Sequence, residues 1–395
     1  MLRESRLSGL GTLRWRVAGL AAAIALVVGG GAWFVIARGP GQGGIKDAAA
    51  KQATRVHTAT AKPITVVSIS PSAQATGVNG ATPISVTFSA PLAAHSPMPT
   101  VTPSVAGSWQ RTGPATVEFV PTAGFTEQTQ VQVSVPAGSS GVQSASGGQL
   151  ATQVTSSFTT GSYSVMRVEQ LLAQLGYLPV TWAPAPGATV VASNDASAQL
   201  SAAYNPPDGT FTFQSGYPSQ LQNMWVAGQT NEVLTGAVMA FESDHSLTMD
   251  GDAGPEVWGA LLSAVAAGQN NTHGYTYAIA SQVQPETLTV WHNGSVIMTS
   301  PANTGIPAAP TSIGTFPVYL RYTFQIMKGT NPDGTPYSDP VSWVSYFKAG
   351  EAVHYFPRAS YGFQQSLGCV ELPMAQAKFV WPYMTYGTLV TVTAL

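Results

Sequence analysis

Short runs of alternating apolar and polar residues follow one another from Ile64 to about Thr160. The clearest run is Gln130–Val135, where every second side chain is a valine and would lie on one face of an extended strand. Clusters of Pro, Gly and Ser separate the runs at the intervals typical of antiparallel strands joined by turns. The pattern predicts a β-sandwich over residues 63–161. Its other expected strands are Ile64–Ile69, Ile84–Phe88, Thr116–Val120 and Ser156–Thr159.

The apolar period becomes helical in residues 164–178. Gly176 follows the last apolar position and is a typical helix end. A second helix is expected from about Glu232 to His245. The segment 179–230 lacks this period and is rich in Ser, Thr, Asn, Gln and aromatic residues, which favours strands or loops. We therefore expect a small helical domain over residues 162–268 that carries 179–230 as an insertion.

The last part of the chain, residues 275–395, has strand-like patterns again. A helix is expected only at Met374–Tyr383, where Pro373 stands just before the start. The expected strands are Tyr275–Val283, Thr287–His292, Ser295–Ser300, Phe316–Tyr322, Val353–Phe356 and Thr388–Thr393. The predicted fold class is therefore a multidomain, mainly β protein with a small helical domain between two β-rich ones.

The N-terminus predicts a membrane anchor. Residues 17–37 carry no charge, and a helix of 21 residues spans about 30 Å of hydrocarbon. Four arginines and one glutamate precede this segment, so residues 1–16 are expected in the cytoplasm and the rest outside, on the cell-wall side. Residues 38–62 are expected to be a linker. A cleaved signal peptide is the competing interpretation.

Composition excludes several function classes. Only 9% of the 395 residues are charged and the net charge is −2, so nothing indicates nucleic-acid binding. With one cysteine the chain forms no internal disulfide and no multi-thiolate zinc site. Asp250-Gly251-Asp252 lacks the acidic positions of a calcium loop and is interpreted as a turn. We expect no metal and no cofactor.

The single cysteine is the strongest chemical candidate. Cys369 follows Gly368, and His354 lies 15 positions upstream. A thiolate attacks acyl carbons well, but a free thiol with a pKa near ~8.5 needs a neighbouring base, for which histidine is well suited. The competing interpretation of a lone cysteine is a small buried apolar side chain.

Two accessory regions resemble known domains. The phrase from Ser70 to Ser89 resembles the bacterial Ig-like domains of secreted proteins. Residues 162–268 resemble the small three-helix peptidoglycan-binding domain. The resemblance rests on the order of the expected helices, followed by Met249–Pro255 and then Trp258. The insertion 179–230 departs from that pattern.

The C-terminal domain resembles the L,D-transpeptidase (YkuD) family over essentially all of residues 275–395. Thr311–Phe316 is similar to the family's Thr-Pro-x-Gly-x-Phe block. Trp343–His354 resembles the strand that leads to the active-site His. Ser366–Val370 resembles the Ser-His-Gly-Cys-hydrophobic signature, with Leu367 in place of its His. Glu371 stands where the family usually has Arg or Asn.

The resemblance implies a mechanism and a set of site residues. His354 would deprotonate Cys369, which attacks the bond before the terminal D-Ala of a peptidoglycan tetrapeptide stem, and an amine of a second stem would resolve the thioester into a 3→3 cross-link. Gly368 would help to hold the oxyanion through its backbone. Tyr337, Ser366 and Tyr355 are expected on the substrate side, although Ser366 also suits a turn.

The expected partners are donor and acceptor stem peptides, the cytoplasmic membrane through the N-terminal helix, and carbapenem-type inhibitors. The negative charge of Glu371 is expected near the site, where it would weaken docking of a carboxylate. Leu367 and Glu371 leave two alternatives open: a weak or inactive tether that binds the wall, or an L,D-carboxypeptidase.

Overall fold

The computed structural model describes residues 61–122 and 124–394. Within them no helix is long and apolar enough to cross a membrane. The longest, α4 (Glu232–Asp244) and α5 (Pro255–Ala267), have 13 residues each, about 20 Å against a ~30 Å hydrocarbon core. The expected fold class included a transmembrane helix, and the structure does not support it. We therefore correct the fold class to a mainly β multidomain protein without that helix among the described residues. That expectation falls on residues 17–37, which lie outside the described residues, as do the expected tail 1–16 and nearly all of the linker 38–62.

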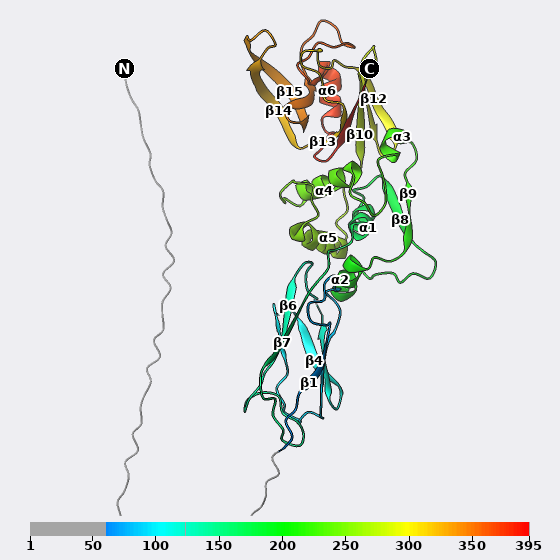
Figure 1. Cartoon of the computed structure of the whole chain (residues 1–395). Helices are drawn as coiled ribbons and strands as arrows, with labels where there is room; N and C mark the ends of the chain where they lie inside the picture. The colour runs from blue at the N-terminus through cyan, green and yellow to red at the C-terminus, as the bar shows by residue number, and fades with distance from the viewer. Residues whose placement is uncertain (1–60, 123, 395) are drawn as a thin grey trace, which may run out of the picture. The chain divides into compact units, whose positions relative to one another are not determined.

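The first described region is a sandwich of two antiparallel sheets (Figure 1). Alternating valines of one sheet, such as Val131 and Val133, pack against Val86 and Val117 of the other in one buried core. The alternation in the sequence is thus the packing pattern of the sandwich. The sheets have the orders β1-β2-β5-β4 and β3-β6-β7, with β1 Val66–Ser70, β2 Ile84–Phe88, β3 Thr100–Thr102, β4 Gly107–Gly113, β5 Thr116–Pro121, β6 Gln130–Val135 and β7 Val154–Thr159.

Helices α1 (Val165–Leu175), α4 and α5 share a buried core in the middle region. Helix α1 ends at Gly176 in the left-handed conformation (φ 82°), as its sequence predicts. Helix α4 begins at Asn231, whose side chain accepts a hydrogen bond from the N–H of Leu234. The segment 179–230 holds the hairpin β8 (Val180–Pro184) and β9 (Gly209–Phe213) together with α2 (Ala196–Tyr204) and α3 (Ser219–Gln222).

The C-terminal region has two sheets and one helix around a second core. Val353 and Val370 of one sheet pack with Ala278 and Leu288 of the other. The five-stranded sheet has the order β12-β11-β10-β18-β13, with β10 Thr276–Ser281, β11 Thr287–His292, β12 Ser295–Pro301, β13 Gly314–Pro317 and β18 Leu389–Thr393. The four-stranded sheet has the order β14-β15-β16-β17, with β14 Leu320–Thr330, β15 Pro336–Lys348, β16 Glu351–Tyr355 and β17 Val370–Leu372, and the helix is α6, Met374–Val380.

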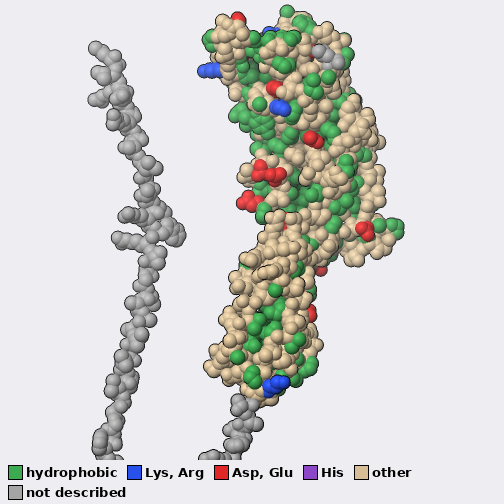
Figure 2. Space-filling model, in the orientation of Figure 1, with side chains coloured by type: hydrophobic (Ala, Val, Ile, Leu, Met, Phe, Trp, Pro, Cys, Tyr) green, Lys and Arg blue, Asp and Glu red, His purple; other side chains and the backbone are tan. Residues whose placement is uncertain are grey.

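The long hairpin β14–β15 contributes most of the four-stranded sheet and carries an irregularity that matters for the site. Between Ser342 and Ser345, β15 has one residue more than β16, and Trp343 there has φ 55°. An extra residue changes which side chains share a face. As a result Val341 and Tyr346, five positions apart, both line the same cavity. In the face of the molecule drawn in Figure 2, charged side chains are few and scattered, as the composition predicts.

Candidate active site

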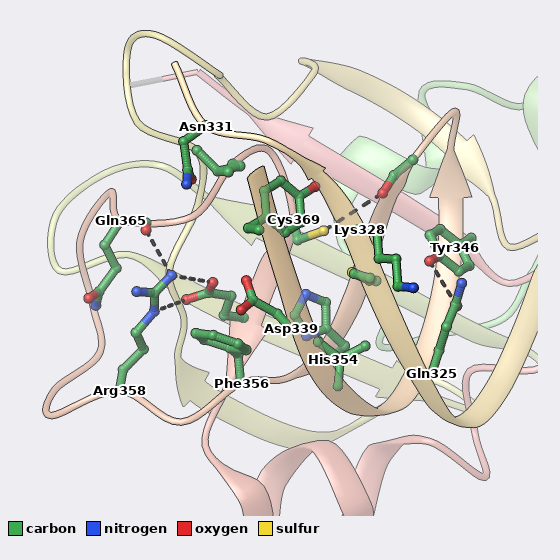
Figure 3. A pocket seen from close by; sticks show the side chains of 16 residues that line it. Gln325, Lys328, Asn331, Asp339, Tyr346, His354, Phe356, Arg358, Gln365 and Cys369 are labelled. Atoms are coloured by element: carbon green, nitrogen blue, oxygen red, sulfur yellow. Dashed lines mark hydrogen bonds and ion pairs between the residues drawn. The ribbon is translucent and has the colours of Figure 1, made fainter. Parts of the chain in front are cut away.

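The parallel pairing of β16 and β17 brings the two candidate catalytic residues together. His354 lies opposite Glu371, and Val353 lies opposite Val370. Because side chains alternate along a strand, Cys369 shares a face with Glu371 two residues later, and therefore with His354. Val353 and Val370 point to the other face and enter the core. His354 and Cys369 line one cavity of about 390 Å³ (Figure 3).

His354 is placed as a neutral base. The residue is 3% exposed, and its Nδ1 lies 3.0 Å from the backbone oxygen of Tyr355. A carbonyl only accepts hydrogen bonds, so Nδ1 carries the proton and Nε2 of the neutral ring is free of one. Burial lowers the pKa of His354, while the Tyr355 carbonyl and Glu371 act in the opposite direction. Tyr355 thus contacts the site through its backbone, and the substrate contact expected of its side chain stays a prediction.

Cys369 is held as a thiol. Its Sγ lies 3.8 Å from the backbone oxygen of Gly350, toward which the S–H donates. Burial raises the pKa of Cys369 to about 12; a backbone contact with Ala352 lowers it, and the charges of Glu371 and Glu351 raise it. At neutral pH the sulfur is therefore protonated before substrate binds, so nucleophilic attack needs a base to remove the proton.

A tight turn presents Cys369 to the cavity. The hydroxyl of Ser366 donates to the backbone oxygen of Cys369 at 2.6 Å, and the N–H of Gly368 donates to Ser366 Oγ at 3.2 Å. Gly368 has φ 106°, a conformation that residues with a Cβ rarely adopt. Ser366 is 1% exposed, so its hydroxyl serves the turn. Leu367, at the position of the family's His, lines the cavity.

Glu371 is paired with a cation, and the expectation that its charge weakens docking of a carboxylate stays a prediction. Its side chain is 5% exposed and pairs with Arg358, whose Nε and Nη2 donate to the two carboxylate oxygens at 2.8 and 2.7 Å. Asn303 Nδ2 donates to the same carboxylate at 3.2 Å. The guanidinium and the carboxylate thus form a bidentate ion pair at the cavity wall (Figure 3).

The hairpin β14–β15 supplies the opposite wall. Tyr337 and Tyr346 line the cavity, and the Tyr346 hydroxyl donates to Gln325 Oε1 at 2.9 Å. Burial raises the pKa of Tyr346 to about 12 and raises that of Tyr337. The thiolate form of Cys369 would raise both further, because both phenols lie near the sulfur. Gly329 leaves room for Tyr337, since a Cβ there would lie 2.5 Å from the phenol oxygen.

The cavity is also lined by residues that the sequence did not point to, among them Arg358, Asp339, Gln325 and Tyr346. Asp339 stands two positions after Tyr337 on a strand, and this alternation was a signal that could have found it. The other three carry no local signal. Among residues 61–122 and 124–394, no group of three His, Cys, Asp or Glu side chains is arranged to hold a metal ion.

Two family models match the chain. Residues 276–392 match the YkuD family, described as the L,D-transpeptidase catalytic domain, and residues 60–160 match a bacterial Ig-like domain. Both resemblances expected from the sequence are thereby confirmed. Neither of these two models extends over residues 162–268, whose peptidoglycan-binding character stays a prediction. No curated protein matches the sequence.

Solved structures of L,D-transpeptidases are also similar. The enzyme from Mycobacterium smegmatis is 16% identical, covering 84% of this chain and 100% of its own, with a TM-score of 0.29. L,D-transpeptidase 3 from Mycobacterium tuberculosis is 16% identical over 83% and 98%, with a TM-score of 0.28. The catalytic domain from E. faecium is 28% identical over 30% and 96%, with a TM-score of 0.28. At these TM-scores the assignment rests on the family models.

Proposed function

The chain carries an L,D-transpeptidase catalytic domain of the YkuD family behind a bacterial Ig-like domain, and from this we propose that it is a peptidoglycan L,D-transpeptidase that forms 3→3 cross-links through a Cys369 thioester. One observation carries the proposal: a buried, neutral His354 and a partly exposed Cys369 share one face of the sheet and one cavity. The reaction takes place on the cell-wall side, where stem peptides are found.

In the acylation step, His354 Nε2 takes the proton of Cys369 as the sulfur attacks the carbonyl carbon that precedes the terminal D-Ala. The C–S bond forms, the C–N bond to D-Ala breaks, and the leaving amine takes the proton from His354. The Tyr355 carbonyl stabilises the imidazolium that forms transiently. Because burial raises the pKa of the thiol, His354 has to take this proton for the sulfur to act as a nucleophile.

Backbone N–H groups at Gly368 and Cys369 would stabilise the oxyanion. The N–H of Gly368 donates to Ser366 Oγ over 3.2 Å, a long and therefore weak hydrogen bond. To stabilise the oxyanion, the N–H of Gly368 has to leave Ser366 Oγ and donate to the substrate oxygen instead. The buried hydroxyl of Ser366 keeps its other bond, to the Cys369 carbonyl, and holds the turn in place during the exchange.

The test is acylation of the full-length chain by a carbapenem, whose strained β-lactam carbonyl mimics the acyl donor. Intact-protein mass spectrometry should show one adduct on the wild type and none on Cys369→Ala, a change that removes the nucleophile but little volume. His354→Ala should slow acylation by about 100-fold or more, the typical contribution of a general base. An equal amount of adduct on Cys369→Ala would overturn the assignment of the nucleophile.

The cross-link itself is tested by incubating the same proteins with tetrapeptide stems and separating the products by mass. Loss of D-Ala with formation of a 3→3 dimer supports transpeptidation. Loss of D-Ala with tripeptide alone would identify a carboxypeptidase, and no change of the stems by a folded protein would identify a tether. For residues 162–268, we propose contact with peptidoglycan, on the ground of their helical order alone.

A further inference from the structure

Four charged side chains line the cavity: Lys328, Asp339, Arg358 and Glu371. Arg358 and Glu371 neutralise each other through their bidentate pair. Of the other two, Lys328 is exposed on β14 while Asp339 is only partly exposed on β15. The described residues contain no ion pair between them. Asp339 is thus a partly buried charge in this wall that has no salt-bridge partner among the described residues.

The position of Asp339 on β15 places its side chain in the cavity that His354 and Cys369 also line. It alternates with Tyr337 and Val341 along β15, and all three line the cavity. In the described part of the chain, its carboxylate accepts no hydrogen bond within the site. Its charge raises the pKa values of His354 and Arg358, so it lies near the base as well as the ion pair. Figure 3 shows the Asp339 side chain between Arg358 and His354.

We infer that Asp339 binds the ammonium group of the acceptor, so that this enzyme resolves its thioester with stem peptides that carry a free side-chain amine. The inference rests on the proposed function. A carboxylate without a cationic partner, partly shielded from water and next to the base, attracts an ammonium group more strongly than one in bulk solvent does. It also favours that group over water, the competing nucleophile, which carries no charge.

The position also fits the chemistry of the second half-reaction. The acceptor arrives as R–NH₃⁺ and must lose a proton before its nitrogen can attack. His354, neutral again after D-Ala has left, takes that proton. The amine then attacks the thioester carbonyl, the C–N bond forms, the C–S bond breaks, and Cys369 leaves as a thiolate that recovers a proton from His354. The second proton of the nitrogen goes to solvent. Asp339 holds the ammonium beside His354 and takes no part in the bond changes.

The experiment compares two nucleophiles on the same acyl-enzyme of the full-length chain, formed from a tetrapeptide stem. Nα-acetyl-lysine amide offers an ammonium side chain, and hydroxylamine is uncharged at neutral pH. Asp339→Asn should slow aminolysis by the lysine derivative about tenfold and leave the hydroxylamine rate within about twofold. Asp339→Glu should recover most of the loss. Asp333→Asn, which removes the same charge from the exposed turn of the same hairpin, should change neither rate.

A second measurement does not depend on acylation. Binding of Nα-acetyl-lysine amide and of its uncharged isostere Nα-acetyl-norleucine amide to Cys369→Ala is followed by NMR. The double variant Cys369→Ala/Asp339→Asn should lose about tenfold affinity for the lysine derivative only. If the stems fail to acylate the wild type but this preference is found, the proposed function fails while the ammonium subsite stands. An unchanged lysine preference, or equal losses for both nucleophiles, would overturn the inference.

Discussion

The buried carboxylate of Glu371 in the catalytic domain and those of Glu169 and Glu242 in the helical region have different surroundings. In the catalytic domain Glu371 meets Arg358 and Asn303, and both of its oxygens accept hydrogen bonds. In the helical region Glu169 and Glu242 are 0% exposed, and each accepts one hydrogen bond, from the N–H of a loop glycine, on Oε2 only. In both residues Oε1 is buried without a partner.

The difference shows what decides the charge of a buried acid. Desolvation favours the neutral carboxylic acid, and it raises the pKa values of Glu169 and Glu242 to about 7 each. Arg358 offsets the same cost at Glu371 by direct pairing, and the pKa of Arg358 is raised in return. The catalytic domain therefore holds a fixed, cancelled charge pair near its cavity. The helical region instead holds two acids that ionise near neutral pH.

The largest expected effect follows from removing the cation. Arg358→Met leaves Glu371 buried and unpaired, which should destabilise the catalytic domain by about 3 kcal/mol, the scale for breaking a buried pair. Thermal unfolding of the full-length chain measures it. The control is Arg358→Met with Glu371→Gln, which removes both charges and should recover most of the stability. If the double variant is as unstable as the single one, the loss comes from packing of Arg358 over Phe356, 4.6 Å from its ring, and not from charge.

The helical region should show the next largest effect, as a dependence of stability on pH. Between the unfolded pKa near 4.5 and the folded pKa of about 7, the unfolded chain releases the Glu242 proton and the folded chain keeps it. Stability therefore falls as pH rises through this window and is lowest above pH 7. Glu242→Gln cannot ionise, so it should be more stable than the wild type at pH 8, by about 2 kcal/mol, and equal near pH 4.5.

Melting curves of the two proteins from pH 4.5 to 8 measure this difference. Glu169→Gln should behave alike, because Glu169 has the same burial and the same single hydrogen bond. Glu118→Gln, at a partly exposed position of β5, is the control and should leave the pH slope unchanged. An identical pH slope in the wild type and Glu242→Gln would mean that this carboxyl is not held neutral by the fold.

The chain pattern predicted those elements whose apolar period is strong. Helix α4 was expected at Glu232–His245 and is found at Glu232–Asp244, because a capping Asn and a clear apolar face mark it. Helix α2 was missed. Its sequence, ASAQLSAAY, has no apolar stripe, and its alanines and the Asp195 cap favour a helix without one. The transmembrane helix was expected from hydropathy alone and has no support in the described residues.

In the site, the sequence identified His354 and Cys369 through motif and spacing, and the structure brings them to one cavity. Their roles stay predictions. The ion pair between Arg358 and Glu371 could not be predicted from the sequence. The two residues are 13 positions apart, in a segment without regular structure over most of its length. Which loop residue meets a strand residue depends on how the loop closes, and no periodicity encodes that closure. The pairing of Glu371 was therefore not foreseen, and its effect on carboxylate docking stays a prediction.

The smallest expected effect tests the cancelled pair directly, through the rate of carbapenem acylation at Cys369. Glu371→Gln leaves the Arg358 cation uncompensated at the cavity wall, which should attract the drug's carboxylate and speed acylation up to about threefold, because the guanidinium is partly exposed and screened. Arg358→Met with Glu371→Gln removes both charges and should return the rate to that of the wild type. If the double variant is as fast as Glu371→Gln, then Glu371 repels the carboxylate despite its partner, and the contrast between the two regions does not hold. Rates are compared at low and high salt, since the threefold gain should shrink as ions screen the free cation.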